Sequence, residues 1–281
     1  MRKFLLLCFL CISGQSFSQP GNTSSLDNKS NANIAYELTN PLSDLQIVSL
    51  QWNHNRGLGI NQAGTSQTLQ IGPRFKIDVS ENWNAITRVY INGEKVQNVN
   101  GVNNAGMGPT QIETFFTEKS NKETIWGAGP YLQAPAGQSG EFGSRQWGAG
   151  IRAVFLTKPK PWTLGIKTFQ SWNVGGPAGA GTITSPGTGT TNTFSAWPFM
   201  AYVTENAWVY SFDSESSYNY DARRTFNPIN AGIGKVVRIG DIPVDFSVGA
   251  RYIVSGYPGT LQYPGTPRGW GARAQLTFII E

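Results

Sequence analysis

Hydrophobic and polar residues alternate along most of this chain, and the alternation comes in short runs. From Leu45 onward, runs of about ten residues with a period of two are separated by turn-forming residues, which is typical of β-strands with one apolar and one polar face. No apolar stripe of useful length occurs at helical spacing. The pattern predicts an all-β protein with strands at residues 45–54, 67–79, 82–92, 110–118, 123–132, 145–156, 161–173, 192–203, 207–219, 229–238, 244–254 and 269–280.

The connections between these strands alternate strictly in length. Long ones cover 55–66, 93–109, 133–144, 174–191, 220–228 and 255–268, and short ones cover 80–81, 119–122, 157–160, 204–206 and 239–243. A transmembrane β-barrel has short periplasmic turns and long external loops, whereas a soluble sandwich has no reason to sort its connections this way. We therefore predict a single transmembrane antiparallel β-barrel of about 12 strands over residues 45–281, with both termini on the periplasmic side.

The tryptophans and the two strand faces agree with this topology. Tryptophans that follow short connections are Trp83, Trp126, Trp162 and Trp208, and those beside long loops are Trp147, Trp172 and Trp270. Two such groups are expected from aromatic girdles at the two membrane interfaces. In the last predicted strand, Leu276 and Phe278 oppose Arg273 and Gln275. We expect the apolar face to contact lipid and the polar face to line the lumen.

Two features interrupt the pattern. Pro73, Pro130 and Pro198 stand inside predicted strands, although a closed barrel has no edge strand to hold a proline. We expect bulges or local breaks of the hydrogen-bond ladder at these positions. The run 229–238 alternates poorly, because Lys235 falls on its apolar side.

The first eighteen residues have the features of a secretory signal peptide. Arg2 and Lys3 precede the apolar run from Phe4 to Ile12, and small residues follow, so we expect cleavage after Ser18. Both cysteines leave with this leader, which excludes disulfides and thiol chemistry from the mature chain. Residues 19–44 are polar and rich in Asn and Ser, and we expect them to form an N-terminal segment that can plug the lumen.

Composition and charge exclude several classes. With 12% aromatic and 14% charged residues, the chain is neither a disordered protein nor a coiled coil. The net charge is +5, and it falls to +3 once Arg2 and Lys3 leave, which is too weak to indicate nucleic-acid binding. A single histidine and a mature chain without cysteine argue against a His/Cys metal site. We expect no cofactor and no bound metal.

Charged residues on the polar face of the predicted strands, which alternate with the apolar positions, are expected to line the pore. They are Arg74, Lys76, Asp78, Arg88, Glu113, Arg152, Lys167, Asp213, Glu215, Asp245, Arg251 and Arg273. Seven are basic and five acidic, so the predicted lumen charge is +2. Because fixed charge in a pore biases which ions enter, we expect a mild preference for anions.

A catalytic centre is not indicated. His54, the sole possible imidazole base, shares parity with Trp52 and Leu50, which places it on the lipid side, and no hydrolase-like motif surrounds a serine. Asp213 and Glu215 lie two residues apart on one face. Such a pair suits acid/base chemistry or calcium, but we favour ion pairs with lumen cations.

Several short stretches are similar to one known family. They are Asn40-Pro41-Leu42-Ser43-Asp44-Leu45, Asn82-Trp83-Asn84-Ala85-Ile86-Thr87-Arg88, Trp126-Gly127-Ala128-Gly129-Pro130, Trp147-Gly148-Ala149-Gly150, Pro161-Trp162-Thr163-Leu164-Gly165, Glu215-Ser216-Ser217-Tyr218 and Gly269-Trp270-Gly271-Ala272-Arg273. In this order, over most of residues 40–281, they resemble the bacterial outer-membrane barrels grouped as MetA-pathway of phenol degradation proteins, also labelled transporter or neuromedin U. The resemblance implies an outer-membrane barrel with a transport role, and no catalytic residue is carried over from it.

Together these observations favour an outer-membrane β-barrel of a Gram-negative bacterium that acts as a passive channel or transporter for small solutes. The lumen charge favours anionic solutes, and the family's name implies aromatic ones. Two alternatives stay open: a closed structural or adhesion barrel that displays its external loops, and a hydrolase embedded in the barrel. The expected partners are outer-membrane lipid, the outer-membrane assembly machinery and small solutes, without nucleic acid.

Overall fold

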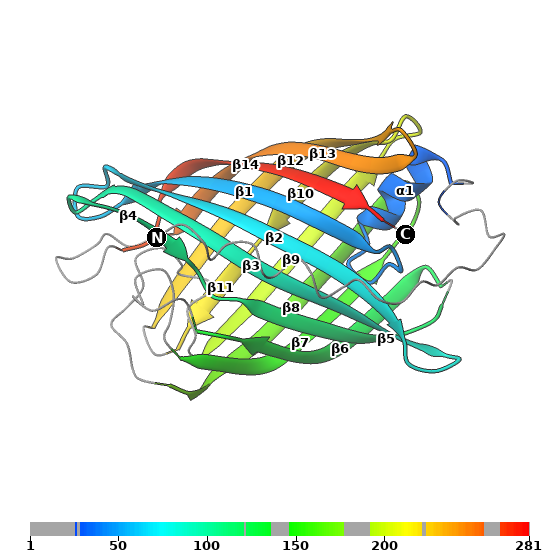
Figure 1. Cartoon of the computed structure of the whole chain (residues 1–281), viewed down its shortest axis with the longest axis horizontal. Coiled ribbons are helices and arrows are strands. Elements are labelled where there is room, and N and C mark those ends of the chain that lie inside the picture. The colour runs from blue at the N-terminus through cyan, green and yellow to red at the C-terminus, as the bar shows by residue number, and fades with distance from the viewer. Residues whose placement is uncertain are drawn as a thin grey trace, which may run out of the picture.

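The computed structural model describes residue 26 and residues 29–120, 122–135, 146–176, 192–220, 223–255 and 265–280. The signal peptide predicted at 1–18 lies outside these ranges, and so do large parts of the loops predicted at 133–144, 174–191 and 255–268. Within them, the chain forms one short helix followed by strands that run side by side as an elongated, closed antiparallel barrel (Figure 1).

The barrel has 12 strand positions, as the sequence pattern predicts. Its strands are β1 (Ile47–Leu58), β2 (Gly64–Asp78), β3 (Trp83–Val99), β4 (Val102–Met107), β5 (Gln111–Glu118), β6 (Thr124–Gln133), β7 (Trp147–Thr157), β8 (Trp162–Gly175), β9 (Thr193–Val203), β10 (Trp208–Ser214), β11 (Ser216–Asn219), β12 (Arg224–Ile239), β13 (Ile242–Ser255) and β14 (Gly269–Ile279). β1 pairs with β14 to close the ring, and β10 and β11 share one position between β9 and β12. β4 pairs with β3 beyond the ring.

The alternation places apolar side chains outside and polar side chains inside, as predicted. On β13, Val248 is 61% exposed on the outer surface, whereas Ser247 and Gly249 line the interior. A broad apolar exterior of this kind suits hydrocarbon rather than water. Lys235, which disturbs the pattern of β12, faces outward, and its ammonium lies 4.7 Å from the centre of the Trp208 ring.

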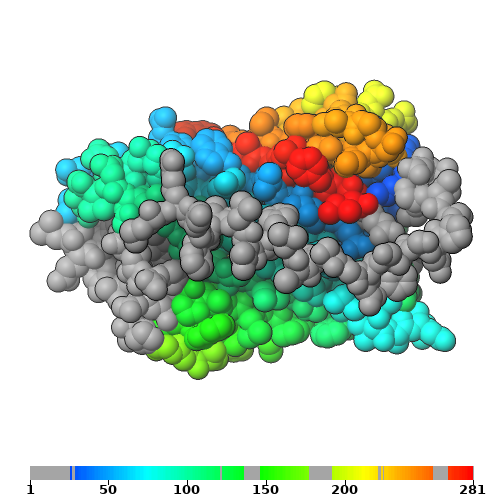
Figure 2. Space-filling view, viewed as in Figure 1, coloured from blue at the N-terminus to red at the C-terminus, as the bar shows by residue number. Residues whose placement is uncertain are grey.

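The strands extend further on the long-loop side than predicted. The connection predicted at 93–109 is wrong, because β3 continues to Val99 and returns as β4 (Figure 1). In the space-filling view, the blue-green atoms of this hairpin lie at one end of the molecule (Figure 2). Asn98 and Asn100 adopt positive φ angles of 55° and 52° at this turn, which Asn tolerates better than most residues. The outward positions Lys95 and Gln97 are polar because they lie beyond the apolar band of the barrel. The alternation of apolar and polar residues that indicates a strand is therefore absent there. The loop predicted at 220–228 is also too long, since β12 begins at Arg224.

The three strand prolines break the ladder locally and leave the register unchanged. The β2–β3 ladder is interrupted beside Pro73, the β5–β6 ladder beside Pro130, and the pairing of β9 with β10 and β11 beside Pro198. Proline has no N–H to donate, so a missing rung is its expected effect. The gap beside Pro198 falls at Glu215, which separates β10 from β11.

The helix α1 (Asn31–Leu38) precedes the barrel, and the sequence pattern does not indicate it. With eight residues it is too short to show an apolar stripe. Ser30 caps it by accepting a hydrogen bond from the Asn33 backbone N–H at 3.2 Å. No helix in the described ranges is long and apolar enough to cross a membrane.

Apolar contacts hold α1 at the end of the barrel where the short turns lie. Ile34 and Ala35 are fully buried in a cluster with Val203, Val236 and Ile279. These three partners come from the short-turn ends of β9, β12 and β14. In Figure 1 the helix accordingly lies beside the end of β14.

Candidate functional site

The interior of the barrel holds a cavity of about 500 Å³. Most strands of the ring contribute to its lining, and on β12 and β13 small residues leave room for it. Eight of the predicted pore-lining residues border it: Arg74, Arg88, Arg152, Asp213, Glu215, Asp245, Arg251 and Arg273. Within the described ranges, five arginines and four acids border the cavity, so its formal charge excess is one positive charge. The fourth acid is Glu94.

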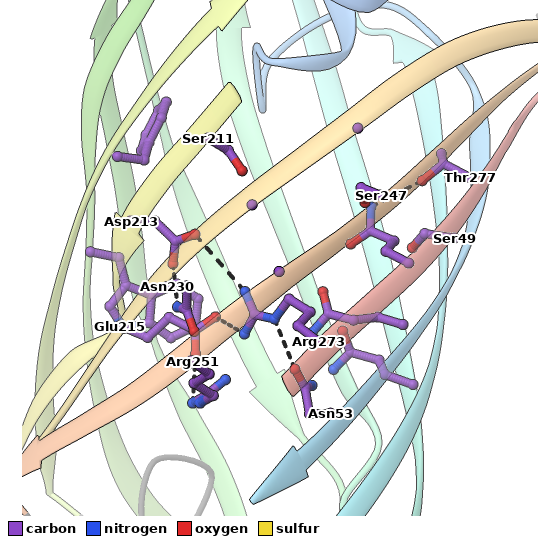
Figure 3. Close-up of a pocket in the computed structure, with 18 of the residues that line it drawn as sticks. Ser49, Asn53, Ser211, Asp213, Glu215, Asn230, Ser247, Arg251, Arg273 and Thr277 are labelled. Carbon is purple, nitrogen blue, oxygen red and sulfur yellow. Dashed lines mark hydrogen bonds and ion pairs between the residues drawn. The ribbon is translucent and has the colours of Figure 1, made fainter. Parts of the chain in front are cut away.

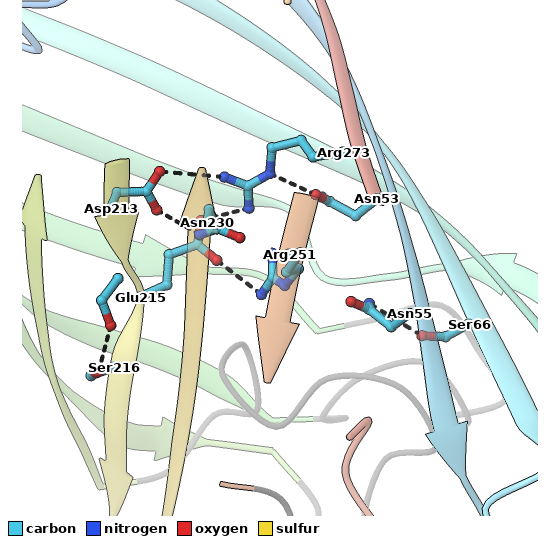
Figure 4. Close-up of polar contacts among 10 residues, drawn as sticks. Asn53, Asn55, Ser66, Asp213, Glu215, Ser216, Asn230, Arg251 and Arg273 are labelled. Carbon is cyan, nitrogen blue, oxygen red and sulfur yellow. Dashed lines mark hydrogen bonds and ion pairs between the residues drawn. The ribbon is translucent and has the colours of Figure 1, made fainter. Parts of the chain in front are cut away.

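Charged and polar side chains on one wall form the Arg273 cluster, which consists of Asn53, Asp213, Glu215, Asn230, Arg251 and Arg273 (Figures 3 and 4). Glu215 is shared by two arginines: its Oε1 lies 2.8 Å from Nη2 of Arg273, and its Oε2 lies 3.0 Å from Nη2 of Arg251. Asp213 Oδ1 lies 3.9 Å from Arg273 Nη1. Two carboxylates and two guanidiniums therefore neutralise each other.

Hydrogen bonds fix the geometry of this cluster. Arg273 Nε donates to Asn53 Oδ1 at 2.8 Å, and Asn230 Nδ2 donates to Asp213 Oδ2 at 2.6 Å. A guanidinium offers several N–H donors in a rigid plane, so Arg273 can contact both carboxylates and an amide at once. Of the roles considered for Asp213 and Glu215, the contacts match ion pairing with lumen arginines.

A second group, the Glu113 cluster, lies on the other side of the ring and consists of Tyr90, Glu113, Tyr131, Arg152, Lys167, Phe169 and Trp197. Arg152 forms an ion pair with Glu113, and Lys167 Nζ lies 3.6 Å from Glu113 Oε1. The Tyr90 hydroxyl donates to Glu113 Oε1 at 2.7 Å. Glu113 is fully buried, so it stands behind the cavity wall and compensates the cations there.

Aromatic rings surround the two cations of the Glu113 cluster. The Arg152 guanidinium lies 4.1 Å from the ring centre of Tyr131 and 4.4 Å from that of Phe169. Lys167 Nζ lies 4.6 Å from the ring centre of Trp197. Such cation–π contacts add to the ion pairs and hold both side chains in place.

The N-terminal segment, residues 29–45, is attached to the lumen wall by side chains of the barrel. Arg74 is buried and donates to the Leu45 backbone oxygen at 2.9 Å and to Ser43 Oγ at 2.9 Å. Arg88 Nη2 donates to the Pro41 oxygen at 2.9 Å. Backbone carbonyls thus take the place of acids as partners for these two arginines.

Further contacts connect α1 to the short turns. The Thr39 and Thr163 hydroxyl oxygens lie 2.6 Å apart, and the Tyr36 hydroxyl donates to the Lys158 oxygen at 2.5 Å. Burial and, secondarily, the charge of Glu123 raise the pKa of the Tyr36 phenol, so it stays protonated as a donor at neutral pH. The segment therefore lies across the short-turn end of the lumen.

Four predicted pore-lining residues do not border the cavity. Glu113 and Lys167 lie behind its wall, whereas Lys76 and Asp78 form a rim ion pair at 3.7 Å. Sequence reasoning missed Glu94, because it falls in the stretch 93–109 that was expected to be a loop. Its parity with Arg88 on β3 is the signal that could have found it.

Two sequence predictions concern a metal site and the position of His54. Over the described residues, no group of three or more His, Cys, Asp or Glu side chains could hold a metal ion. The His54 ring stacks on Trp52, with ring centres 5.8 Å apart, and Trp52 is exposed on the outer surface. This matches the lipid-side placement expected for His54.

No family model matches the sequence, and no curated protein matches it. The structure is similar to the COG4313 outer membrane channel from Pseudomonas putida F1, with a TM-score of 0.64 and 11% identity over 85% of this chain and 97% of that one. Outer membrane phospholipase A from Escherichia coli aligns with a TM-score of 0.44 and 11% identity over 89% of this chain and 98% of that one. The translocator domain of autotransporter NalP from Neisseria meningitidis aligns with a TM-score of 0.45 and 12% identity over 84% of this chain and 88% of that one.

The closed ring, the apolar exterior and the polar interior define a transmembrane β-barrel. The likeness to the Pseudomonas putida structure places its fold among the outer-membrane barrels.

Proposed function

We propose that this protein is a channel for small solutes in the outer membrane of a Gram-negative bacterium. The observation that carries the proposal is the cavity of about 500 Å³ inside a closed barrel, bordered by polar and charged side chains. An eight-stranded barrel is filled by its own side chains, but a ring of twelve can leave an opening. The similar structure from Pseudomonas putida is described as an outer membrane channel, which supports this use of the fold.

In this proposal the N-terminal segment is a plug at the short-turn end. Its hydrogen bonds to Arg74, Arg88 and Thr163 hold it across the route that solutes would take. Small ions can pass beside it, whereas larger solutes require it to shift. The assignment to the MetA-pathway group belongs to the same proposal and rests on the sequence resemblance.

We further propose a weak preference for anions. The Arg273 cluster is neutral, so the charge excess comes from the wall that carries Arg74, Arg88 and Arg152. An excess of one charge creates a small field, which salt screens over about 10 Å at 0.1 M. Small carboxylates are the solute class that such a wall favours. Asp245→Asn should strengthen the preference, and reversal potentials across a salt gradient measure it.

Conductance of the full chain in planar lipid bilayers tests the channel itself. Ser247 lines the cavity and its neighbour Val248 faces outward, so they form a matched pair. Ser247→Trp should reduce the single-channel current several-fold, and Val248→Trp should leave it unchanged. A native protein without conductance would instead favour the closed barrel that displays its loops, an alternative that the position of the N-terminal segment keeps open.

We assign no catalytic role to any residue. His54 stacks on Trp52 outside the lumen and does not border the cavity. His54→Ala should not change any lipid-hydrolysis signal. The proposed partners are lipid around the exterior, the outer-membrane assembly machinery that inserts such barrels, and the solutes.

A further inference from the structure

The outer surface carries an aromatic groove near the short-turn end of three neighbouring strands. It has a volume of about 370 Å³ and is lined by Trp162, Met200, Tyr202, Tyr210, Ser211 and Phe212 of β8, β9 and β10. The Trp162 and Tyr202 rings meet edge to face with centres 4.8 Å apart, and Tyr202 and Tyr210 lie 6.4 Å apart. These ring contacts form the walls of the groove, and aromatic pairs of this geometry attract each other beyond the area that they bury.

A cation lies beside this groove on the next strand. Lys235 of β12 pairs with Trp208 of β10, and Ile233 pairs with Tyr210, which lines the groove. Lys235 is thus a diagonal neighbour of Tyr210 on the outer face. Three other outward positions of the described strands are charged: Arg56 and Lys95 toward the long-loop ends of β1 and β3, and Glu118 as the last residue of β5. On the short-turn side, Lys235 is thus the cation and Glu118 the anion.

A charged side chain on the lipid face is unfavourable unless its charge reaches the interface or an anion. The Lys235 ammonium lies 4.7 Å from the centre of the Trp208 ring, and Trp208 begins β10 directly after a short turn, at interfacial depth. The ammonium therefore lies where phospholipid phosphates lie, and the apolar groove leads from there toward the middle of the barrel.

We propose that this groove and Lys235 form a binding site for one anionic phospholipid of the leaflet on the short-turn side. The phosphate pairs with the Lys235 ammonium, and one acyl chain lies in the groove between Tyr202, Tyr210 and Phe212. A zwitterionic lipid offers the same chain but a weaker net charge, so the site selects phosphatidylglycerol over phosphatidylcholine.

Tryptophan quenching by brominated lipid tests the site. The full chain is reconstituted in phosphatidylcholine vesicles with a minor fraction of phosphatidylglycerol, and the dibrominated acyl chains are placed on one lipid or the other. The difference between native protein and Trp162→Phe isolates the signal from the groove. We expect phosphatidylglycerol to be enriched there about fivefold, because one lysine near an anionic surface contributes about 1 kcal/mol, which corresponds to that factor.

Three variants separate the site from general attraction to basic residues. Lys235→Gln should abolish the enrichment and Lys235→Arg should keep it, which also shows that a charge at this position is compatible with folding. Lys122→Gln, which changes an exposed lysine in a short turn, should keep it. Equal quenching by both lipids in the native protein, or enrichment that survives Lys235→Gln, would overturn the proposal. An equal loss in Lys122→Gln would overturn it too, because the attraction would then be diffuse.

Discussion

Replacing Glu113 with glutamine removes the carboxylate that Arg152, Lys167 and Tyr90 share. The side chain is buried, so its loss leaves two cations without their anion. At the 3.6 Å between Glu113 and Lys167, a pair of unit charges is worth about 5 kcal/mol at an effective dielectric constant of 20, but about 1 kcal/mol in bulk water. Breaking one partner of a buried pair costs about 3–5 kcal/mol, because the remaining charge is uncompensated. We expect Glu113→Gln to lower the free energy of unfolding by that amount.

Urea titration of the protein in phosphatidylcholine vesicles, followed by tryptophan fluorescence, measures the change. Glu81→Gln is the control, since this exposed residue in the β2–β3 turn should alter the free energy of unfolding by less than about 0.5 kcal/mol. The double variant Glu113→Gln with Lys167→Met removes one of the two uncompensated cations and should recover part of the lost free energy of unfolding. A loss below about 1 kcal/mol for Glu113→Gln would refute the reasoning, because water in the lumen would then screen the cluster.

The plug, the lipid face and the orientation can each be tested. Cysteines at Thr39 and Thr163, whose hydroxyl oxygens lie 2.6 Å apart, should form a disulfide that slows the uptake of larger solutes into proteoliposomes until a reductant is added; unaffected uptake would contradict the plug. Val248→Arg should cost about 2–4 kcal/mol of unfolding free energy near the midplane, and Ser247→Arg much less; equal losses in urea titration would show that the faces are misassigned. An epitope in the β3–β4 turn should be labelled on intact cells and one in the β12–β13 turn should not, and the reverse pattern would invert the topology.

Alternation predicts the ring well because each barrel strand separates two solvents. Lipid outside and a polar lumen inside impose opposite demands on successive residues, so the sequence itself reports the register. Beyond the membrane this constraint ends. Lys95 and Gln97 of β3 are polar on the outward side, and the strand therefore continues where the pattern predicted a loop.

Parity also predicts which charged residues face inward, but it does not predict their partners. Glu113 contacts Arg152 and Lys167 because ring neighbours bring β5, β7 and β8 together, at sequence separations that no local pattern encodes. For the same reason the sharing of Glu215 by Arg251 and Arg273 emerges in the structure alone.

The position of α1 cannot be predicted from the sequence, for a different reason. Arg74 and Arg88 hold the N-terminal segment through backbone carbonyls, and every residue type has one. Such a contact does not require any particular residue type in the segment, so it cannot be predicted from the composition of the segment. The polar character of residues 19–44 indicated a segment that can plug the lumen, and the structure is required to locate the helix within it.

The attachment of the N-terminal segment has a consequence for the order of assembly. Arg238 of β12 donates to the Lys29 oxygen at 3.1 Å, Thr163 of β8 contacts Thr39, and Arg74 of β2 contacts Leu45. These side chains lie on strands far apart around the ring. All of them can contact the segment together once the ring has closed. Docking is then a late step of biogenesis, although the segment leaves the ribosome before every strand. Once docked, it connects the ends of distant strands, and we expect the short-turn end of the barrel to unfold as one cooperative unit.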